Sequence, residues 1–316
     1  MVKQPIFLEP VFKERIWGGD RLHRLFGYHI PSEQTGECWA ISAHSNGESI
    51  VKSGRFEGKS LSYLWEHHQE LFGNRTEAKF PLLTKILDAK NDLSVQVHPD
   101  DHYASKVENG EPGKTECWYV IDCEPGAEII IGHQAKTKQK FVEMIETGQW
   151  NKLLSRLKVQ KGDFFYVPSG TIHAIGAGVL ILETQQSSDI TYRVYDYDRV
   201  DPDGRTRKLH LDKAIEVSNI PHPDNATAPL VNVYEGASIV TFVRANYFSV
   251  YKWEIQTSLS YEVTEDFLIC SVIEGCGELK TGAGTYPFQK GDHFLLSNQI
   301  GRVEVEGKIT VIVSHP

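Results

Sequence analysis

Short stretches of alternating apolar and polar residues recur along most of the chain, and turn-forming residues separate them. Glycine occurs 26 times and proline 14 times among 316 residues. Alternation with a period of two is typical of β-strands, and frequent turns favour a sandwich or barrel over a doubly wound α/β sheet. The pattern therefore predicts a mainly β protein.

Three stretches break this pattern and predict short helices. Apolar residues recur at helical spacing over 61–72, where Ser60 could cap the helix. Residues 138–157 predict a second helical segment, interrupted near Gly148, and residues 209–217 predict a third. The helical stretches are short and few compared with the expected strands, and residues 138–157 are expected to be a helical insert in the β fold.

One segment has the composition of a linker between domains. Residues 219–230 contain three prolines and show no periodicity. From about residue 231 the chain consists of expected strands and turns. We therefore predict two domains, 1–230 and 231–316, with the helical segments near 61–72 and 138–157 in the first.

Composition and charge exclude several classes of protein. No run of about 18 apolar residues and no secretory signal is present, so we expect no membrane span. The net charge of -9 disfavours nucleic acid as a partner. Five scattered cysteines without CxxC spacing indicate free thiols in a reducing, cytoplasmic compartment. No obligate protein partner is evident from the sequence.

Candidate metal ligands begin in the segment LSVQVHPDD at 93–101. On a β-strand, Val95 and Val97 project to one face, whereas Gln96 and His98 project to the other. Gln96 and His98 lie two residues apart and could bind one ion together. Alternatively, His98 is an ordinary core histidine and Gln96 only supports a ligand.

Two further segments supply a carboxylate and a second histidine. Glu116 in GKTECWYVID shares a strand face with bulky apolar residues, where a charge needs a partner or a metal. Glu116 could instead pair only with Lys114, although we expect those two side chains to project to opposite sides. In GDFFYVPSGTIHAIG, a turn at Pro168–Gly170 gives His173 a defined position. This donor set suits catalytic zinc, and also iron or manganese.

A second cluster of polar residues lies at 183–199, in ETQQSSDITYRVYDYDR. Arg193 shares an expected strand face with Thr191 and Tyr195. Such an arginine could hold a phosphate or a developing oxyanion. Alternatively, Arg193 forms a structural ion pair with Glu183 or Asp189.

The metal segments together resemble the cupin superfamily, and the fuller set resembles the type I mannose-6-phosphate isomerase family. The resemblance is carried by WGG at 17–19, QVHPDD at 96–101, GKTE at 113–116, PSGTIHA at 168–174 and QQSSDITYR at 185–193. These segments occur in the family's order, and the length is similar to the short bacterial form. The resemblance implies two cupin-like β domains.

The resemblance also implies a ligand set and roles for two basic residues. The family's zinc ligands fall on Gln96, His98, Glu116 and His173, which implies one zinc ion per chain. The family's active-site arginine falls on Arg193. Its lysine before the ligand glutamate falls on Lys114, as a substrate-binding residue. The second domain is expected to lack a metal site, because GDHFLLSNQIG at 291–301 has neither the proline nor the histidine of the first.

The implied activity is the reversible interconversion of mannose 6-phosphate and fructose 6-phosphate, with a small phosphosugar as the only partner. The reaction moves a proton between C1 and C2 through a cis-enediol, with zinc and Arg193 stabilising negative charge. The base stays open among Glu183, Asp189, a histidine and solvent on the metal. Two alternatives are an Fe(II) oxygenase of the cupin class and a non-catalytic sugar-binding cupin.

Overall fold

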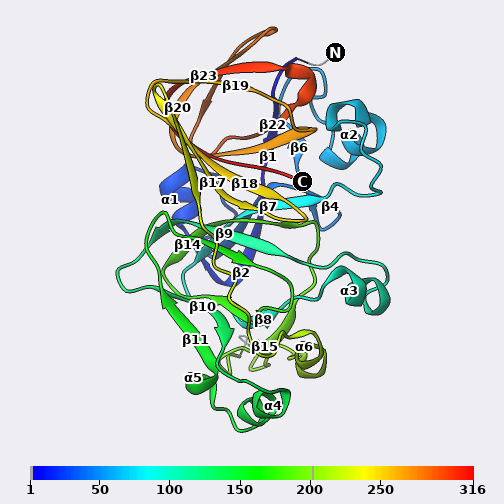
Figure 1. Cartoon of the computed structure of the whole chain (residues 1–316), viewed down its shortest axis with the longest axis vertical. Coiled ribbons are helices and arrows are strands. Elements are labelled where there is room, and N and C mark those ends of the chain that lie inside the picture. The colour runs from blue at the N-terminus through cyan, green and yellow to red at the C-terminus, as the bar shows by residue number, and fades with distance from the viewer. Residues whose placement is uncertain (1–2, 201–202) are drawn as a thin grey trace.

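A computed structural model describes residues 3–200 and 203–316 of the chain. Strands make up most of the ordered elements and build three large sheets that are stacked along the long axis (Figure 1). Short helices lie at the periphery. The prediction of a mainly β protein with a small helical part is confirmed.

The first sheet has five strands, and helices cover its outer face. Val95 and Val97 project into an outer apolar cluster that includes Phe141 of a covering helix. The residues that alternate with them therefore face the second sheet. The strand order is β11 (Leu154–Lys158), β10 (Glu128–His133), β13 (His173–Ile175), β8 (Val95–Val97) and β15 (Tyr192–Tyr195).

The second sheet has six strands and forms the middle layer. Every residue of its strands β14 and β7 is buried, because both faces of the sheet are covered. Ile181 packs toward the first sheet, and Leu182 packs toward the third. The order is β12 (Phe164–Val167), β9 (Glu116–Cys123), β14 (Val179–Gln186), β7 (Leu82–Ala89), β2 (Val11–Gly19) and β3 (Thr35–Ile41). The short strands β4 (Ala43–His44) and β5 (Gly47–Glu48) pair separately.

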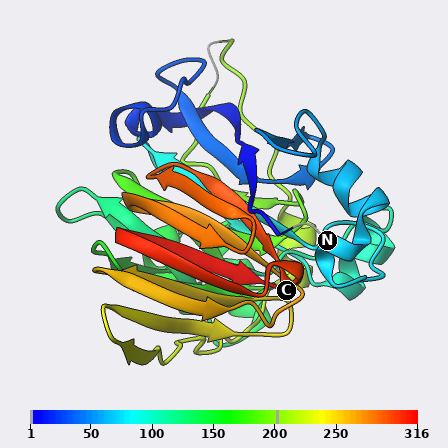
Figure 2. The same ribbon diagram turned by 90° about the horizontal axis from the view of Figure 1, so that it is seen from above.

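The third sheet combines the end of the chain with its beginning (Figure 2). Its main path is β16 (Leu230–Tyr234), β17 (Ala237–Arg244), β18 (Ser249–Ile255), β23 (Arg302–His315), β20 (Phe267–Thr281), β22 (His293–Ser297), β1 (Ile6–Glu9) and β6 (Ile50–Val51). Two further strands, β19 (Ser258–Glu262) and β21 (Gly284–Gln289), pair with β23 and β20. Residues on both sides of position 230 thus share one sheet, and the boundary near 230 stays a prediction.

The helices are short and include two that the sequence pattern did not predict, α1 and α3. In the predicted stretch 61–72, Ser60 caps the helix by accepting a hydrogen bond from the backbone N–H of Tyr63. The helices are α1 (Arg21–Phe26), α2 (Leu61–His67), α3 (Asp101–Val107), α4 (Lys138–Glu146), α5 (Trp150–Leu153) and α6 (Leu211–Val217), with 3-10 turns η1 (Gln69–Phe72) and η2 (Asn298–Ile300).

The prediction of helix through residue 157 is wrong at its C-terminal end. From Leu154 the chain forms β11, which pairs with β10, and Leu157 lies opposite Ile129. A free strand edge on β10 offers this segment backbone partners, and that pairing overrides its apolar spacing. Leu157 is consequently 43% exposed and is not part of a buried helix face.

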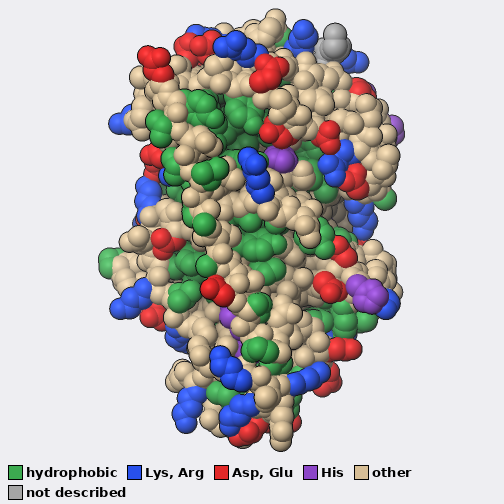
Figure 3. Space-filling view, viewed as in Figure 1, with side chains coloured by type: hydrophobic (Ala, Val, Ile, Leu, Met, Phe, Trp, Pro, Cys, Tyr) green, Lys and Arg blue, Asp and Glu red, His purple; other side chains and the backbone are tan. Residues whose placement is uncertain are grey.

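The surface carries charges of both signs. The face in Figure 3 shows acidic and basic side chains interspersed over all three layers. Within the described residues, no helix has the length and apolar character needed to cross a membrane.

Candidate active site

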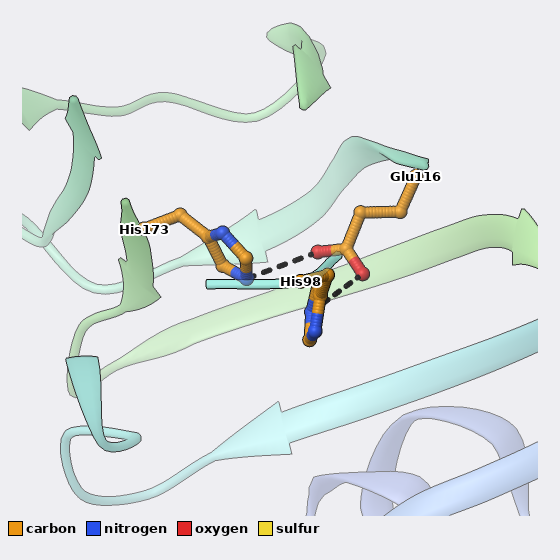
Figure 4. Close-up of side chains that lie close together, drawn as sticks. All are labelled: His98, Glu116 and His173. Atoms are coloured by element: carbon orange, nitrogen blue, oxygen red, sulfur yellow. Dashed lines mark ion pairs between the residues drawn. The ribbon is translucent and has the colours of Figure 1, made fainter. Parts of the chain in front are cut away.

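Three of the predicted metal ligands lie together between the first and second sheets. His98 follows β8, Glu116 begins β9 and His173 begins β13 (Figure 4). Each residue offers one ligand atom, and these atoms all lie within 4.8 Å of one another. All three side chains are buried, so a single ion could contact them together.

The carboxylate of Glu116 directs one oxygen toward each imidazole. Its Oε2 lies 3.4 Å from Nε2 of His98, and its Oε1 lies 3.5 Å from Nε2 of His173. Both distances exceed those of ordinary hydrogen bonds. The donor atoms therefore converge without satisfying one another.

The backbone fixes one nitrogen of His173 and leaves the other free. Nδ1 lies 2.9 Å from the carbonyl oxygen of Thr171, so it carries the proton and donates it there. Nε2 then presents a lone pair to the cluster and has no hydrogen-bond partner among the described residues. A buried, unpaired imidazole nitrogen held in this way fits metal ligation.

The electrostatics keep the three side chains in the protonation states that metal binding needs. Desolvation, followed by the charge of Lys114, lowers the pKa of His98 to about 3. Desolvation also lowers the pKa of His173. Burial acts to raise the pKa of Glu116, but the charge of Lys114 outweighs burial and holds that pKa well below its usual range. The cluster thus presents neutral imidazoles and an ionised carboxylate.

Lys114 reaches into the same cluster. Its ammonium group pairs with Oε2 of Glu116 and lies 3.0 Å from Nε2 of His98. The expectation that Lys114 and Glu116 project to opposite sides is wrong, because residues two apart in an extended segment share a side. Burial acts to lower the pKa of Lys114, but Glu116 and Glu183 outweigh burial and raise it. Lys114 therefore stays cationic.

Gln96, the fourth predicted ligand, lies beside the cluster in β8. It is the cross-strand neighbour of both His173 and Arg193. Paired residues of adjacent strands project to the same face of a sheet. Gln96 also lines the cavity next to the cluster, where its amide could bind an ion or support His173.

A cavity of about 380 Å³ adjoins the cluster. Its wall has more basic groups than acidic ones, which suits an anionic ligand although the whole chain has a net charge of -9. The basic residues are Arg15, Lys85, Lys114, Arg193 and Arg207, and the acidic residues are Glu37, Glu183 and Asp189. The remaining wall consists of Trp17, Leu87, Leu93, Ser94, Gln96 and Thr191.

Arg193 lines this cavity and is held by neutral groups. Its Nε donates to Oγ of Ser94 at 3.3 Å, and its Nη1 donates to the carbonyl of Lys208 at 2.9 Å. Among the described residues it forms no ion pair with Glu183, Asp189 or any other carboxylate, so the alternative of a structural ion pair is not found. Its guanidinium is thus available to an anion in the cavity.

The sequence reasoning missed Lys85, which lies on the cavity wall in β7. Its Nζ lies 3.8 Å from Oε2 of Glu183, its cross-strand neighbour in β14, and both side chains are buried. Desolvation, followed by the charge of Glu116, raises the pKa of Glu183 to about 7. The available signal was a lysine within the mostly apolar run PLLTKILDA, which predicts a charge on a covered strand.

Trp118 connects Glu183 to the metal cluster. Its indole Nε1 donates to Oε1 of Glu116 at 3.0 Å and to Oε1 of Glu183 at 3.3 Å. A single donor therefore lies between the two buried carboxylates and fixes both toward the space between the sheets. Glu183 was one of several candidates for the base in the sequence, and the structure brings it to the cavity wall.

Comparison with known proteins agrees with this geometry. The family described as "Phosphomannose isomerase type I, catalytic domain" matches residues 6–119, and "Mannose-6-phosphate isomerase, cupin domain" matches residues 238–316. The chain is 56% identical over 316 residues to mannose-6-phosphate isomerase ManA of Bacillus subtilis, with all of both chains covered. It is 52% identical to mannose-6-phosphate isomerase of Streptococcus mutans, covering 99% of this chain and 98% of the relative.

A solved structure extends the similarity to three dimensions. The crystal structure of the mannose 6-phosphate isomerase from Bacillus subtilis superposes with a TM-score of 0.97 at 55% identity, covering 99% of each chain. The prediction of cupin-like domains is confirmed by the matching cupin family and by this neighbour. The sequence identity over the full chain and the shared fold both point to the same family. The chain belongs to the type I mannose-6-phosphate isomerase family.

Proposed function

We propose that this protein interconverts mannose 6-phosphate and fructose 6-phosphate. The observation that carries the proposal is a buried His98–Glu116–His173 cluster beside a cavity in which Arg193 has no carboxylate partner among the described residues. The cavity's basic wall suits a phosphosugar. Family membership supports the same activity, and the relatives compared above give no support to the oxygenase or the sugar-binding alternative.

We propose one zinc ion per chain, held by His98, Glu116 and His173 with Gln96 beside them. Nitrogen and oxygen donors in this combination are typical of catalytic zinc. When bound, such an ion supplies Lewis acidity toward the oxygens of the sugar. The free Nε2 of His173 and the low pKa of Glu116 support this assignment.

Three basic side chains of the cavity are proposed to stabilise the charge of the substrate and of the reaction's intermediate. The cis-enediol develops negative charge on oxygen, and a fixed guanidinium stabilises such charge without reorganising. Arg193 is held for this purpose by Ser94 and by the carbonyl of Lys208. Lys114 is proposed to donate to a substrate oxygen, and Arg207 is a candidate for the phosphate because it lines the cavity.

Glu183 is the best-placed base among the carboxylates of the cavity. Glu37 is held by both Arg15 and the indole of Trp39, and Asp189 is exposed. Glu183 is buried, and its partners among the residues that the structure describes are one hydrogen bond of 3.3 Å and one ion pair of 3.8 Å. Its carboxylate would take the proton from C2 of the aldose and return it to C1, and the reverse reaction retraces these steps.

The cell compartment is proposed as the cytoplasm. All five cysteines are free thiols, and three of them are buried. Free thiols persist in a reducing compartment, which supports this assignment.

The proposed function is tested by following conversion of mannose 6-phosphate to fructose 6-phosphate on the purified protein. Turnover is measured before chelation, after chelation and after zinc is restored, with metal content measured at each stage. We expect turnover to disappear with the metal and to return with it. Absence of turnover in a folded, zinc-loaded sample would refute the isomerase proposal.

A further inference from the structure

The edge strand of the third sheet, β16, is exposed along its whole length. All five of its residues are exposed, and four of them are large and apolar. The exposed fractions are 59% for Leu230, 55% for Val231, 79% for Val233 and 49% for Tyr234. Figure 2 shows this strand, in olive, at the outer edge of the sheet. The surface is therefore an open strand edge with apolar side chains on both faces.

This edge lacks most of the features that normally prevent strands from pairing with other chains. Proteins protect edge strands with lysines, prolines, inward charges or β-bulges. The sequence LVNVY contains no charge and no proline, and its register with β17 runs without a shift from Leu230 to Tyr234. Its short length is the one remaining protection, and it limits how tightly another strand can bind.

The hydrogen bonding within the hairpin determines which backbone groups point outward. Only two residues separate Tyr234 from its partner Ala237, so these two form a hydrogen-bonded pair. Hydrogen-bonded pairs alternate along an antiparallel ladder. The N–H and C=O groups of Val231 and Val233 therefore face the open edge, while those of Asn232 face β17.

The sequence of β16 is self-complementary about its central residue. When two copies run antiparallel about Asn232, Val231 lies opposite the partner's Val233, and Leu230 lies opposite the partner's Tyr234. In this register the outward backbone groups of the two valines meet each other and can exchange both hydrogen bonds. Pairs of β-branched residues, and of an aromatic with an aliphatic residue, stabilise antiparallel strands, and no like charges are opposed.

We propose that β16 joins two copies of this protein in a weak, two-fold symmetric dimer. The two third sheets then form one continuous sheet across the interface, with Asn232 of each copy on the symmetry axis. A closed two-fold pair covers both strand edges, so assembly stops at the dimer. A contact of five residues is small beside a standard interface, so the dimer forms at high protein concentration and is not obligate.

The cavity beside the metal cluster lies between the first and second sheets, and β16 contributes no residue to its wall. Changes in β16 should therefore leave turnover per chain unaltered. This separates the dimer proposal from the proposed function, because either one can fail while the other holds.

Charge reversal tests the predicted register. Sedimentation velocity of the full chain from about 1 to about 500 µM should show a concentration-dependent dimer. The variant Val231→Lys/Val233→Lys, and separately Val231→Glu/Val233→Glu, should each stay monomeric, since like charges then face each other. An equimolar mixture of the two variants should restore the dimer. Both positions are exposed, so circular dichroism should be unchanged.

A cysteine scan gives an independent test of the symmetry axis. Asn232→Cys, made in a Cys276→Ser background because Cys276 is exposed, should form a disulfide-linked dimer under mild oxidation. The opposed Cα atoms would lie about 4.5 Å apart, within the range of a disulfide. Val231→Cys is the matched control. In this register the two cysteines at position 231 are diagonal neighbours, offset by two residues, and lie about 7–8 Å apart.

Three results would overturn the proposal. The unaltered chain could stay monomeric at every concentration, or it could form a dimer that the lysine variant does not weaken. The third is cross-linking of Val231→Cys as fast as Asn232→Cys. A dimer that substitutions in β16 do not weaken would place the contact on another surface. A chain that stays monomeric would show that the β16 edge has no partner strand.

Discussion

At the scale of single residues, the site depends on which atoms its neighbours leave free. The backbone carbonyl of Thr171 takes one nitrogen of His173 and leaves the other for an ion. Ser94 and the carbonyl of Lys208 hold Arg193 without cancelling its charge. Neutral partners thus orient both side chains and leave the Nε2 lone pair of His173 and the charge of Arg193 uncancelled.

His173→Ala should abolish metal binding while leaving the protein folded. The variant removes one of three ligands, and the loss of several kcal/mol of charge stabilisation should lower kcat by roughly 1,000-fold or more. Elemental analysis measures the loss of metal, and near-UV circular dichroism checks that the variant stays folded. His67→Ala is the control, because that histidine lies on α2 and bonds to the carbonyl of Tyr63. A variant with full metal content would remove His173 from the ligand set.

Arg193→Ala should keep its metal and lose most of its turnover. Removing one fixed donor from a developing oxyanion typically costs about 100- to 1,000-fold in kcat. The measurement is kcat together with metal content. Arg199→Ala serves as the control, because Arg199 pairs with Asp196 and does not line the cavity. A kcat close to normal would reduce Arg193 to a structural role.

At the scale of elements, strand pairing and one tight turn determine how the ligands meet. β8 and β13 are neighbours, so Gln96 and His173 share a face of the first sheet, and β9 supplies Glu116 from the second sheet. The turn before β13 is also tied to the other histidine, because the N–H of Gly170 donates to the carbonyl of His98 at 2.8 Å. The turn therefore fixes the two histidines relative to each other.

Gly170→Ala should weaken metal binding and lower the free energy of unfolding. Gly170 has φ of +81°, and an added Cβ would meet Nδ2 of Asn219 at 2.5 Å and the carbonyl of Val217 at 2.9 Å. The left-handed conformation alone costs about 1–2 kcal/mol with a side chain. Gly126→Ala is the matched control, with the same φ and open space around it.

Denaturant unfolding and a zinc-competition titration would compare the two glycine variants. We expect Gly126→Ala to show only the conformational cost, with unchanged zinc affinity. Gly170→Ala should show that cost, a further loss from the displaced Asn219 and weaker zinc binding. Equal effects of both substitutions on stability and zinc affinity would contradict a positioning role for this turn.

At the scale of the whole molecule, the beginning of the chain is tied to its end. Tyr28, just after α1, lies 2.8 Å through its hydroxyl from Nε2 of His293 in β22. The other nitrogen of His293 lies 3.0 Å from Oγ of Ser271 in β20. β1 and β6 pair in the same sheet. The third sheet can therefore be complete only when residues near both termini are in place.

Stability should fall as the pH drops below about 6.5 because of His293. Burial, followed by the charge of Lys52, lowers the pKa of His293 to about 3. Between the unfolded value of about 6.5 and the folded value, only the unfolded chain binds the proton, so acid favours unfolding. Titration of His293 should lower the free energy of unfolding by at most about 1.4 kcal/mol for each pH unit.

Denaturant unfolding at pH 7.5, 6 and 5 measures this dependence. His293→Gln keeps hydrogen-bonding groups near Tyr28 and Ser271 but does not titrate. The variant should be less stable at pH 7.5, yet its stability should change less with pH than that of the unaltered chain. Parallel pH profiles for the two proteins would show that His293 does not carry the effect.

Local sequence patterns were sufficient to predict the residues that cluster between the sheets, but not the residues that surround them. His98 and Gln96 alternate with valines, and the turn before His173 has its own glycine and proline, so each could be predicted from adjacent residues. Lys85 was missed because its partner Glu183 comes from a distant strand. The helix predicted through residue 157 ended early because β10 offered Leu157 a strand partner.

The sequence by itself determined the β character of the chain, the donor residues and the family to which they point. These depend on residue types and on spacings within a few positions, which local geometry converts directly into strands and turns. Only the tertiary structure decided that Lys114 pairs with Glu116, that Glu183 has a raised pKa and that Arg193 has no carboxylate partner within the described part of the chain. Pairings and desolvation of this kind depend on which distant strands become neighbours, and packing of the whole chain decides that.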